Sequence, residues 1–143
     1  MVRMVQGLVA LVGRVLLVAI FLLSAFNDIG NYSPTLDMMR KQHNPVPYPE
    51  VLLPAAIAFL ILGGVSVLIG YMARLGALLL LAFLVLATYY FHDFWNVTGD
   101  AERQGQMIHF FKNVSMMGAM VFLIAVGGGP GSVDEATRRR ATA

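Results

Sequence analysis

The sequence contains no cysteine among its 143 residues, and this absence excludes several kinds of chemistry. Disulfides, thiolate nucleophiles, iron–sulfur clusters and cysteine-based zinc sites all require that residue. Any redox chemistry must therefore use a bound cofactor or another subunit. The sequence also lacks a phosphate-binding glycine loop, because the glycine-rich stretch at Gly127–Gly131 follows a predicted helix where such a loop would precede one.

Charged residues are also scarce, at 13% of the chain, whereas a soluble domain contains roughly a quarter. Hydrophobic residues make up 58%, and the mean hydropathy is +0.72. A small domain has too much surface to bury that many apolar side chains in water. The net charge of +2 is small. We interpret the extra arginines as topology signals, and we expect no nucleic-acid partner.

The apolar residues form four long runs. Leu8–Phe26 contains one charged residue, Arg14, and the other three runs contain none: Val51–Ala73, Leu75–Phe91 and Asn113–Gly129. Each run approaches or exceeds the ~20 residues that cross a bilayer as a helix. The sequence therefore predicts an all-α, polytopic membrane protein, a four-helix bundle with a single domain over residues 1–143 and the lipid bilayer as its surroundings.

The polar and turn-forming residues between these runs set approximate helix boundaries. We expect the spanning helices at about residues 7–28, 51–71, 75–92 and 107–126. The polar, proline-rich segment Asn27–Glu50 is predicted to be a loop with extended backbone before the second helix. The second and third helices are predicted to be antiparallel neighbours, because only Met72–Arg74 connects them. Residues 127–143 are predicted to be a flexible tail.

The basic residues predict the orientation in the membrane. One side carries six arginines, Arg3, Arg14, Arg74, Arg138, Arg139 and Arg140, and the other carries four basic residues, Arg40, Lys41, Arg103 and Lys112. Because basic residues are enriched in cytoplasmic segments, we expect both termini in the cytoplasm. Pairs of small residues four apart, such as Ser66 and Gly70, are interpreted as sites of close helix packing.

Polar side chains gather at the predicted outer ends of the first, third and fourth helices. We predict that they share one pocket, formed by Asp28, His92, Asp93, His109, Lys112 and Asn113. Ionisable groups at this depth are costly unless they pair or touch water in a cavity. If the pocket binds a quinone headgroup, either histidine could donate to a carbonyl oxygen and pass protons to the periplasm.

Each of these residues also has a structural interpretation. Lys112 could extend to the lipid headgroups, and interfacial histidines are often structural. We expect Arg14 and Arg74 to have structural or lipid-contacting roles. The nine methionines and three histidines raise the alternative of copper(I) handling, but core packing accounts better for the methionines, and we expect no metal site.

Several stretches of the chain resemble the DoxX family of small bacterial membrane proteins. They are Gly13–Leu17 with Ile20–Ser24, Leu62–Val65 with Leu68–Gly70, Ala73–Leu80, the end of the third helix at His92, and Phe111–Val114 with Gly129–Asp134. The resemblance implies a four-helix bundle in the bacterial inner membrane. It also implies a link to membrane oxidoreductases, through a relative of the thiosulfate:quinone oxidoreductase small subunit. Asn27-Asp28 stands where family members often carry a lysine, which reverses the local charge.

Three hypotheses about function follow. The first is a membrane subunit of an oxidoreductase, or its partner, that contacts quinone in the outer polar pocket beside other redox subunits. The second is a non-catalytic structural or assembly subunit of a larger membrane complex. The third is a small protein that handles a solute or copper.

Overall fold

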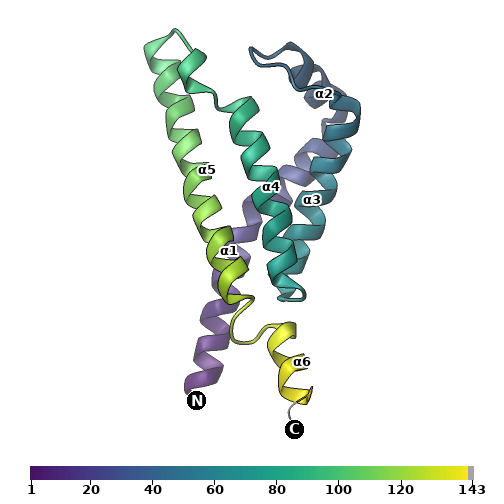
Figure 1. The fold of residues 1–143 in the computed structure, drawn as a ribbon, viewed down its shortest axis with the longest axis vertical. Helices are drawn as coiled ribbons and strands as arrows, with labels where there is room; N and C mark the ends of the chain where they lie inside the picture. Colours follow the sequence, from purple (N-terminus) through teal and green to yellow (C-terminus); the bar gives the residue numbers. More distant parts are fainter. Residues whose placement is uncertain (142–143) are drawn as a thin grey trace.

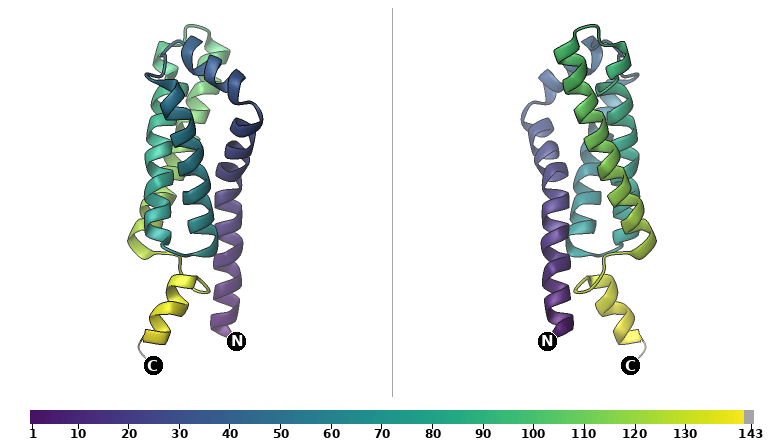
Figure 2. Two further views of the ribbon diagram at one scale, coloured as in Figure 1. Left: turned by 90° about the vertical axis from the view of Figure 1, so that its right-hand side faces the viewer. Right: turned by 90° about the vertical axis from the view of Figure 1, so that its left-hand side faces the viewer.

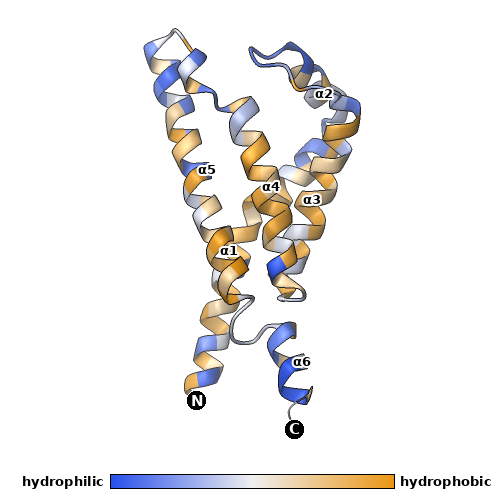
Figure 3. Cartoon of the chain, in the orientation of Figure 1, coloured by the Kyte–Doolittle hydropathy of each residue, from blue (hydrophilic) through white to orange (hydrophobic). Residues whose placement is uncertain are grey.

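The chain folds into helices, and the computed structural model describes residues 1–141 (Figure 1). The elements in chain order are α1 (Val2–Gly30), α2 (Tyr32–Lys41), α3 (Pro49–Ile69), α4 (Ala73–Phe91), the short 3-10 helix η1 (Phe94–Asn96), α5 (Asp100–Val126) and α6 (Val133–Ala141). The helices α1, α3, α4 and α5 are long and apolar enough to cross a membrane. Figure 3 shows the apolar residues along these four helices and the hydrophilic ones around α2 and α6. The prediction of an all-α chain with four candidate membrane spans is confirmed.

Two of the long helices extend beyond the predicted boundaries. The first begins at Val2 instead of about residue 7, and the last begins at Asp100 instead of about residue 107. Hydropathy marks only the apolar part of a helix, whereas the hydrogen-bonded backbone continues into polar sequence. At α5, Asp100 and Glu102 lie in the first turn, where acidic side chains favour the positive end of the helix dipole.

The prediction of an extended loop over Asn27–Glu50 is wrong for the first half of that segment, which contains α2. Pro34 is tolerated because it lies in the first turn of α2, where backbone N–H groups have no partner within the helix. The remaining prolines follow the end of α2 at Lys41, and the backbone there is not helical until α3 begins at Pro49.

The prediction of a flexible tail over residues 127–143 is also wrong for the residues that the structure describes, because Val133–Ala141 forms α6. The Ser132 hydroxyl accepts a hydrogen bond from the Glu135 backbone N–H at 3.1 Å and so caps the helix. Acidic residues occupy the first turn and arginines the last, which suits the helix dipole. Residues 142 and 143 of the predicted tail lie outside the described part.

The four long helices pack in a row. Helix α3 packs against both α1 and α4, and α5 packs against α4. The predicted antiparallel pairing of the second and third spans is confirmed in α3 and α4, whose connection reverses through left-handed backbone at Gly70 and Met72. Figure 1 shows α3, α4 and α5 side by side with α1 running behind them, and Figure 2 shows α1 beside α3. In this contact order α1 and α5 are the two ends of the row. We call the end of the bundle that carries α2 and η1 the α2 end, and the opposite end, with the N-terminus and α6, the terminal end.

The apolar core joins all four long helices. Its buried side chains come from α1, α3, α4 and α5: Val18, Phe21, Ala25, Leu60, Val67, Ala77, Leu80, Leu84 and Met120. Each is at most 2% exposed. A second, smaller apolar cluster joins α2 and the chain after it to the start of α3, through Met39, Val46 and Leu53. This second cluster holds α2 on the bundle.

Helices α3 and α4 approach closely at two glycines. A Cβ atom placed on Gly63 would lie 2.8 Å from the carbonyl oxygen of Gly76, and one placed on Gly76 would lie 2.6 Å from the Ser66 side chain. Real Cβ atoms are not found so near other heavy atoms, so only glycine permits this crossing. The interpretation of the small residues of the second helix as packing sites therefore holds at Gly63 and Ser66.

The terminal end is fastened by the C-terminal segment. The Asp134 carboxylate accepts hydrogen bonds from the backbone N–H groups of Met72 at 2.9 Å and Ala73 at 3.0 Å, at the start of α4. The Asp134 N–H in turn donates to the Gly70 carbonyl at 2.9 Å. These three bonds attach the start of α6 to the turn between α3 and α4.

Candidate functional site

A cavity of about 890 Å³ lies at the α2 end. Side chains from α1, α2, α3, α4 and α5 line it, and α2 contributes Thr35, Met38 and Met39. Most of the lining is apolar. The polar lining residues are Ser24, Asn27, Asp28, Thr35, His92 and Gln106. This volume and this mixture of apolar walls with a few polar groups are typical of small-molecule sites.

The cavity follows from the row arrangement of the helices. Helix α1 packs on α3 and helix α5 packs on α4, so no further long helix fills the space between α1 and α5 at the α2 end. Small side chains at Ala19, Ala56 and Ala87 widen it further. A second cavity of about 170 Å³, with an entirely apolar lining, shares Met39, Ala56, Phe83, Ala87 and Phe91 with the first. The two cavities therefore adjoin each other.

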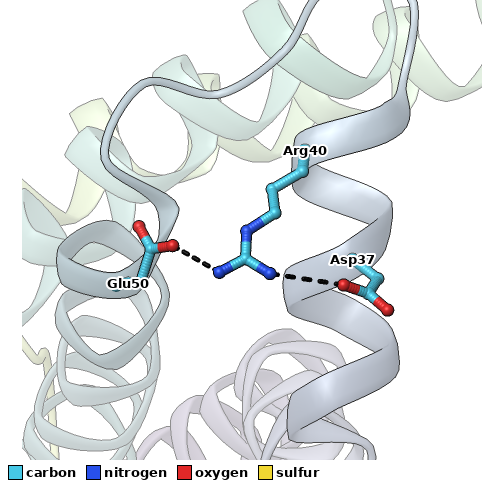
Figure 4. A network of polar contacts seen from close by, with 3 residues as sticks. All are labelled: Asp37, Arg40 and Glu50. Atoms are coloured by element: carbon cyan, nitrogen blue, oxygen red, sulfur yellow. Dashed lines mark hydrogen bonds and ion pairs between the residues drawn. The ribbon is translucent and has the colours of Figure 1, made fainter.

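Helix α2 is held over the cavity by a charged network at its C-terminal end (Figure 4). Arg40 pairs with Asp37 at 3.4 Å and with Glu50 at the start of α3. The hydrogen bond to Glu50 is the main cause that raises the pKa of Arg40 above its ordinary value. Arg40 therefore stays charged and already has two carboxylate partners.

His92 is fixed by a hydrogen bond to helix α5. Its Nδ1 lies 2.8 Å from Oε1 of Gln106. An amide oxygen only accepts, so the hydrogen of this bond belongs to the His92 Nδ1. In the neutral ring the other nitrogen, Nε2, then carries no hydrogen and can accept a proton.

Two further predicted residues, His109 and Lys112, lie on α5 next to His92 and to each other. The rings of His92 and His109 stack with their centroids 5.3 Å apart and an angle of 22° between planes. The Lys112 Nζ donates to Nδ1 of His109 at 3.1 Å. A series of side-chain contacts thus leads from Gln106 through His92 and His109 to Lys112.

The structure distributes the predicted pocket residues over several places. Asp28 and His92 line the cavity, whereas His109 and Lys112 are exposed and do not. Lys112 forms no ion pair with any residue in 1–141. Its side chain is exposed, and its Nζ contacts His109.

The remaining two predicted residues, Asp93 and Asn113, are buried, and each forms a side-chain hydrogen bond. Asp93 accepts from the Asn96 side chain at 2.9 Å and thereby stabilises η1. Asn113 donates to the Thr88 hydroxyl at 3.0 Å, which joins α5 to α4. Neither residue lines the cavity. The predicted set therefore separates into a cavity pair, an exposed pair and a buried structural pair.

Four polar lining residues were not singled out from the sequence: Ser24, Asn27, Thr35 and Gln106. Gln106 was missed because the fourth helix was predicted to begin after it, although its spacing of three from His109 places both on one helix face. Thr35 was missed because α2 was expected to be a loop. Asn27 was noted only as a departure from the family pattern.

The two arginines with expected structural or lipid roles both bind backbone carbonyls at the terminal end. Arg14 is buried, and its Nη1 and Nη2 donate to the carbonyls of Gly128 at 3.0 Å and Gly131 at 3.3 Å. Arg74 is exposed, and its Nη2 donates to the Ala125 carbonyl at 3.1 Å. Among residues 1–141, no three His, Asp or Glu side chains gather closely enough to hold a metal ion.

Comparisons with known proteins add an independent observation. A family model described as DoxX matches residues 9–93, which include α2, α3, α4 and most of α1 as well as His92. The chain is 28% identical over 124 residues to the inner membrane protein YphA of Escherichia coli, covering 87% of this chain and 86% of that protein. It is 27% identical over 130 residues to the inner membrane protein YqjF of the same organism, covering 91% and 92%.

A more distant match is the Surfeit locus protein 4 homolog of Schizosaccharomyces pombe, 26% identical over 126 residues, which cover 87% of this chain and 36% of that protein. No solved structure matches the chain significantly. The bacterial relatives and the four candidate spans confirm the predicted localisation, a multi-pass protein of the inner membrane.

Proposed function

This chain belongs to the DoxX family, and from that premise we propose that it is the membrane subunit of an oxidoreductase, or its partner, whose cavity at the α2 end contacts a quinone. The chain has no cysteine, so the redox centre would reside in a partner subunit. The observation that supports quinone contact most directly is the cavity of about 890 Å³. Its walls are apolar and its polar groups are few.

The lining residues fit a quinone by their chemistry. A quinone ring and its isoprenoid chain are apolar and need a mostly apolar lining, whereas the two carbonyl oxygens need hydrogen-bond donors. The Gln106 amide N–H groups can donate to a carbonyl oxygen, and His92 can do so only in its protonated form, when Nε2 also carries a hydrogen; Phe83 and Phe91 would face the apolar part. A bound quinone would supply two-electron redox chemistry to the partner subunit.

The role of this chain would be to position the headgroup and to move protons. The bond from Nδ1 of His92 to Gln106 fixes the ring and leaves Nε2 as the atom that gains or loses a proton. The Asp28 carboxylate in the same cavity is a second group that can accept a proton. The stacked His109 and its contact Lys112 would connect His92 to the surface.

We also propose the orientation that the arginines predict, with both termini in the cytoplasm. The α2 end and its cavity would then face the periplasm. Reporter fusions at Ala143 and near His43 test this topology. A reporter at Ala143 that is active only outside the cytoplasm would contradict it.

The test of quinone contact uses the chain purified with its native partners in mild detergent. Ala56 lines the cavity, and Ala58 is exposed on the same helix. We expect Ala56→Leu to lower the amount of co-purifying quinone severalfold and Ala58→Leu to leave it unchanged. We also expect His92→Ala to abolish quinone-dependent activity of the complex while the amount of folded protein stays constant.

The outcome also decides between the two leading hypotheses. If redox subunits co-purify but no quinone does, and activity survives His92→Ala, then the assembly-subunit hypothesis replaces quinone contact. If no redox subunit co-purifies either, then the oxidoreductase partnership itself is contradicted.

A further inference from the structure

We propose that the cavity at the α2 end binds lipophilic organic cations, such as quaternary or aromatic amines, with Asp28 as the counter-charge. This activity goes beyond quinone contact, because a quinone carries no charge. The primary observation is the charge of the lining. The residues that line the cavity include one carboxylate, Asp28, and no lysine or arginine.

Asp28 has no cationic partner in the described part of the chain. The ion pairs formed within residues 1–141 involve Asp37, Glu50 and Glu135, and none involves Asp28. Of the two basic side chains on α2, Arg40 is already bound to two of those carboxylates (Figure 4), and Lys41 does not line the cavity. A half-buried carboxylate beside apolar walls is costly without a counter-charge, and a cationic ligand would supply one.

Helix ends of both signs surround the cavity, because α1 and α4 end there whereas α2 and α3 begin there. Asp28 lies in the last turn of α1, and Phe91 and His92 form the end of α4. Neither helix has a basic residue in its last turn. The C-terminal end of a helix carries a partial negative charge, which attracts cations and repels anions. The N-terminal ends of α2 and α3 carry the opposite partial charge, so the helix dipoles offset one another, and Asp28 carries the preference for a positively charged ligand.

The rest of the lining suits the apolar part of such a cation. Phe83 and Phe91 supply aromatic rings, which attract organic cations through their negative faces. Met38 and Met39 supply flexible thioethers that adapt to ligands of different shape. A small hydrated cation would gain nothing from these side chains, whereas a lipophilic one would.

The cavity is also reachable from the side of the bundle. Leu16 and Leu23 of α1 line it, although they are 72% and 68% exposed. Both lie in the span of α1 that is apolar enough to cross the membrane. A lipophilic cation dissolved in the bilayer could therefore enter past α1, which a strongly hydrated ion could not.

The experiment measures binding of radiolabelled tetraphenylphosphonium to the full chain in nanodiscs of zwitterionic phosphatidylcholine. We expect saturable binding to the wild type, and at least a tenfold weaker affinity for Asp28→Asn. The matched control is Asp100→Asn, because Asp100 is an exposed aspartate at the start of α5, and its affinity should equal that of the wild type. Neutral triphenylphosphine oxide should bind equally to the wild type and to Asp28→Asn.

Further variants keep the result interpretable. Ala56→Leu should also weaken phosphonium binding, because it fills the cavity without changing its charge, and it serves if Asp28→Asn does not fold. Equal phosphonium affinity in the wild type, Asp28→Asn and Ala56→Leu would overturn the proposal, as would the absence of saturable binding. Quinone contact is measured separately, by the quinone that co-purifies with the complex. Absence of that quinone, with saturable phosphonium binding that depends on Asp28, would contradict quinone contact and leave cation binding supported.

Discussion

Arg14 of α1 donates a hydrogen bond to the backbone carbonyl of Gly128 at 3.0 Å, across 114 positions of the sequence. Its side chain is buried, and its second terminal nitrogen reaches the carbonyl of Gly131 at 3.3 Å. A charged donor in an apolar span is stabilised only where such acceptors are supplied. The C-terminal segment therefore holds α1, whose main packing partner among the long helices is α3.

Replacing this arginine should loosen the C-terminal segment. Arg14→Met keeps an apolar stem but leaves two carbonyls without a donor. We expect a loss of about 2 kcal/mol in the free energy of unfolding, as for hydrogen bonds to charged groups. Trypsin should also cut α6 at Arg138–Arg140 faster. Arg103→Met, at an exposed position of α5, is the control and should change neither measurement.

The crossing of α3 and α4 should tolerate no side chain at Gly76. Gly76→Ala would place a methyl group 2.6 Å from Ser66, and such overpacking costs about 1–3 kcal/mol. Gly118→Ala is the matched control, because no atom lies within 4 Å of its added Cβ. Denaturant unfolding in detergent measures both. Equal stability of the two variants would show that the helices do not cross as described.

The buried hydrogen bond between Asn113 and Thr88 should couple α5 to α4. In a double-mutant cycle of Asn113→Ala and Thr88→Val, we expect an interaction energy of about 0.5–2 kcal/mol, the range for such bonds between membrane helices. Unfolding free energies of the wild type, both single variants and the double variant give this value. Additive effects of the two substitutions would mean that the bond contributes nothing to stability.

Docking of α6 should depend on pH through Glu135. The Gly131 N–H donates to its carboxylate at 2.8 Å, and this bond, followed by that from Arg139, lowers the pKa of Glu135 below its ordinary value of 4.5. Because the folded pKa is the lower one, the stabilisation is present above the ordinary pKa and disappears as the pH falls through the folded pKa.

Hydrogen exchange of the α6 amides measures this effect. At pH 7, Glu135→Gln should exchange faster than the wild type, and the difference should shrink as the pH falls below 4.5 and through the folded pKa. A difference that does not change with pH would contradict the assignment. Asp100→Asn, whose side chain is far along the chain from α6, serves as the control and should leave α6 unaffected.

The candidate site was predictable in part. Helix spacing placed His109 and Lys112 on one face of α5, and they do contact each other. The sequence could not show that the cavity partner of His92 is Gln106, because that depends on how α5 lies beside the end of α4. It also could not separate Asp28, in the cavity, from Asp93, in a local turn, since both are aspartates at predicted helix ends.

The sequence by itself determined the spanning segments, because crossing a bilayer requires about 20 apolar residues, and such runs are read from composition alone. It also determined that α3 and α4 are antiparallel neighbours, because three residues cannot connect them in any other way. The tertiary structure alone decided that α2 and α6 are helices, because α2 is held by apolar contacts with Val46 and Leu53 and α6 by hydrogen bonds to Met72 and Ala73. It likewise decided that the four spans form a row that leaves a cavity, since the pairing of helices depends on side-chain shape in space and not on hydropathy.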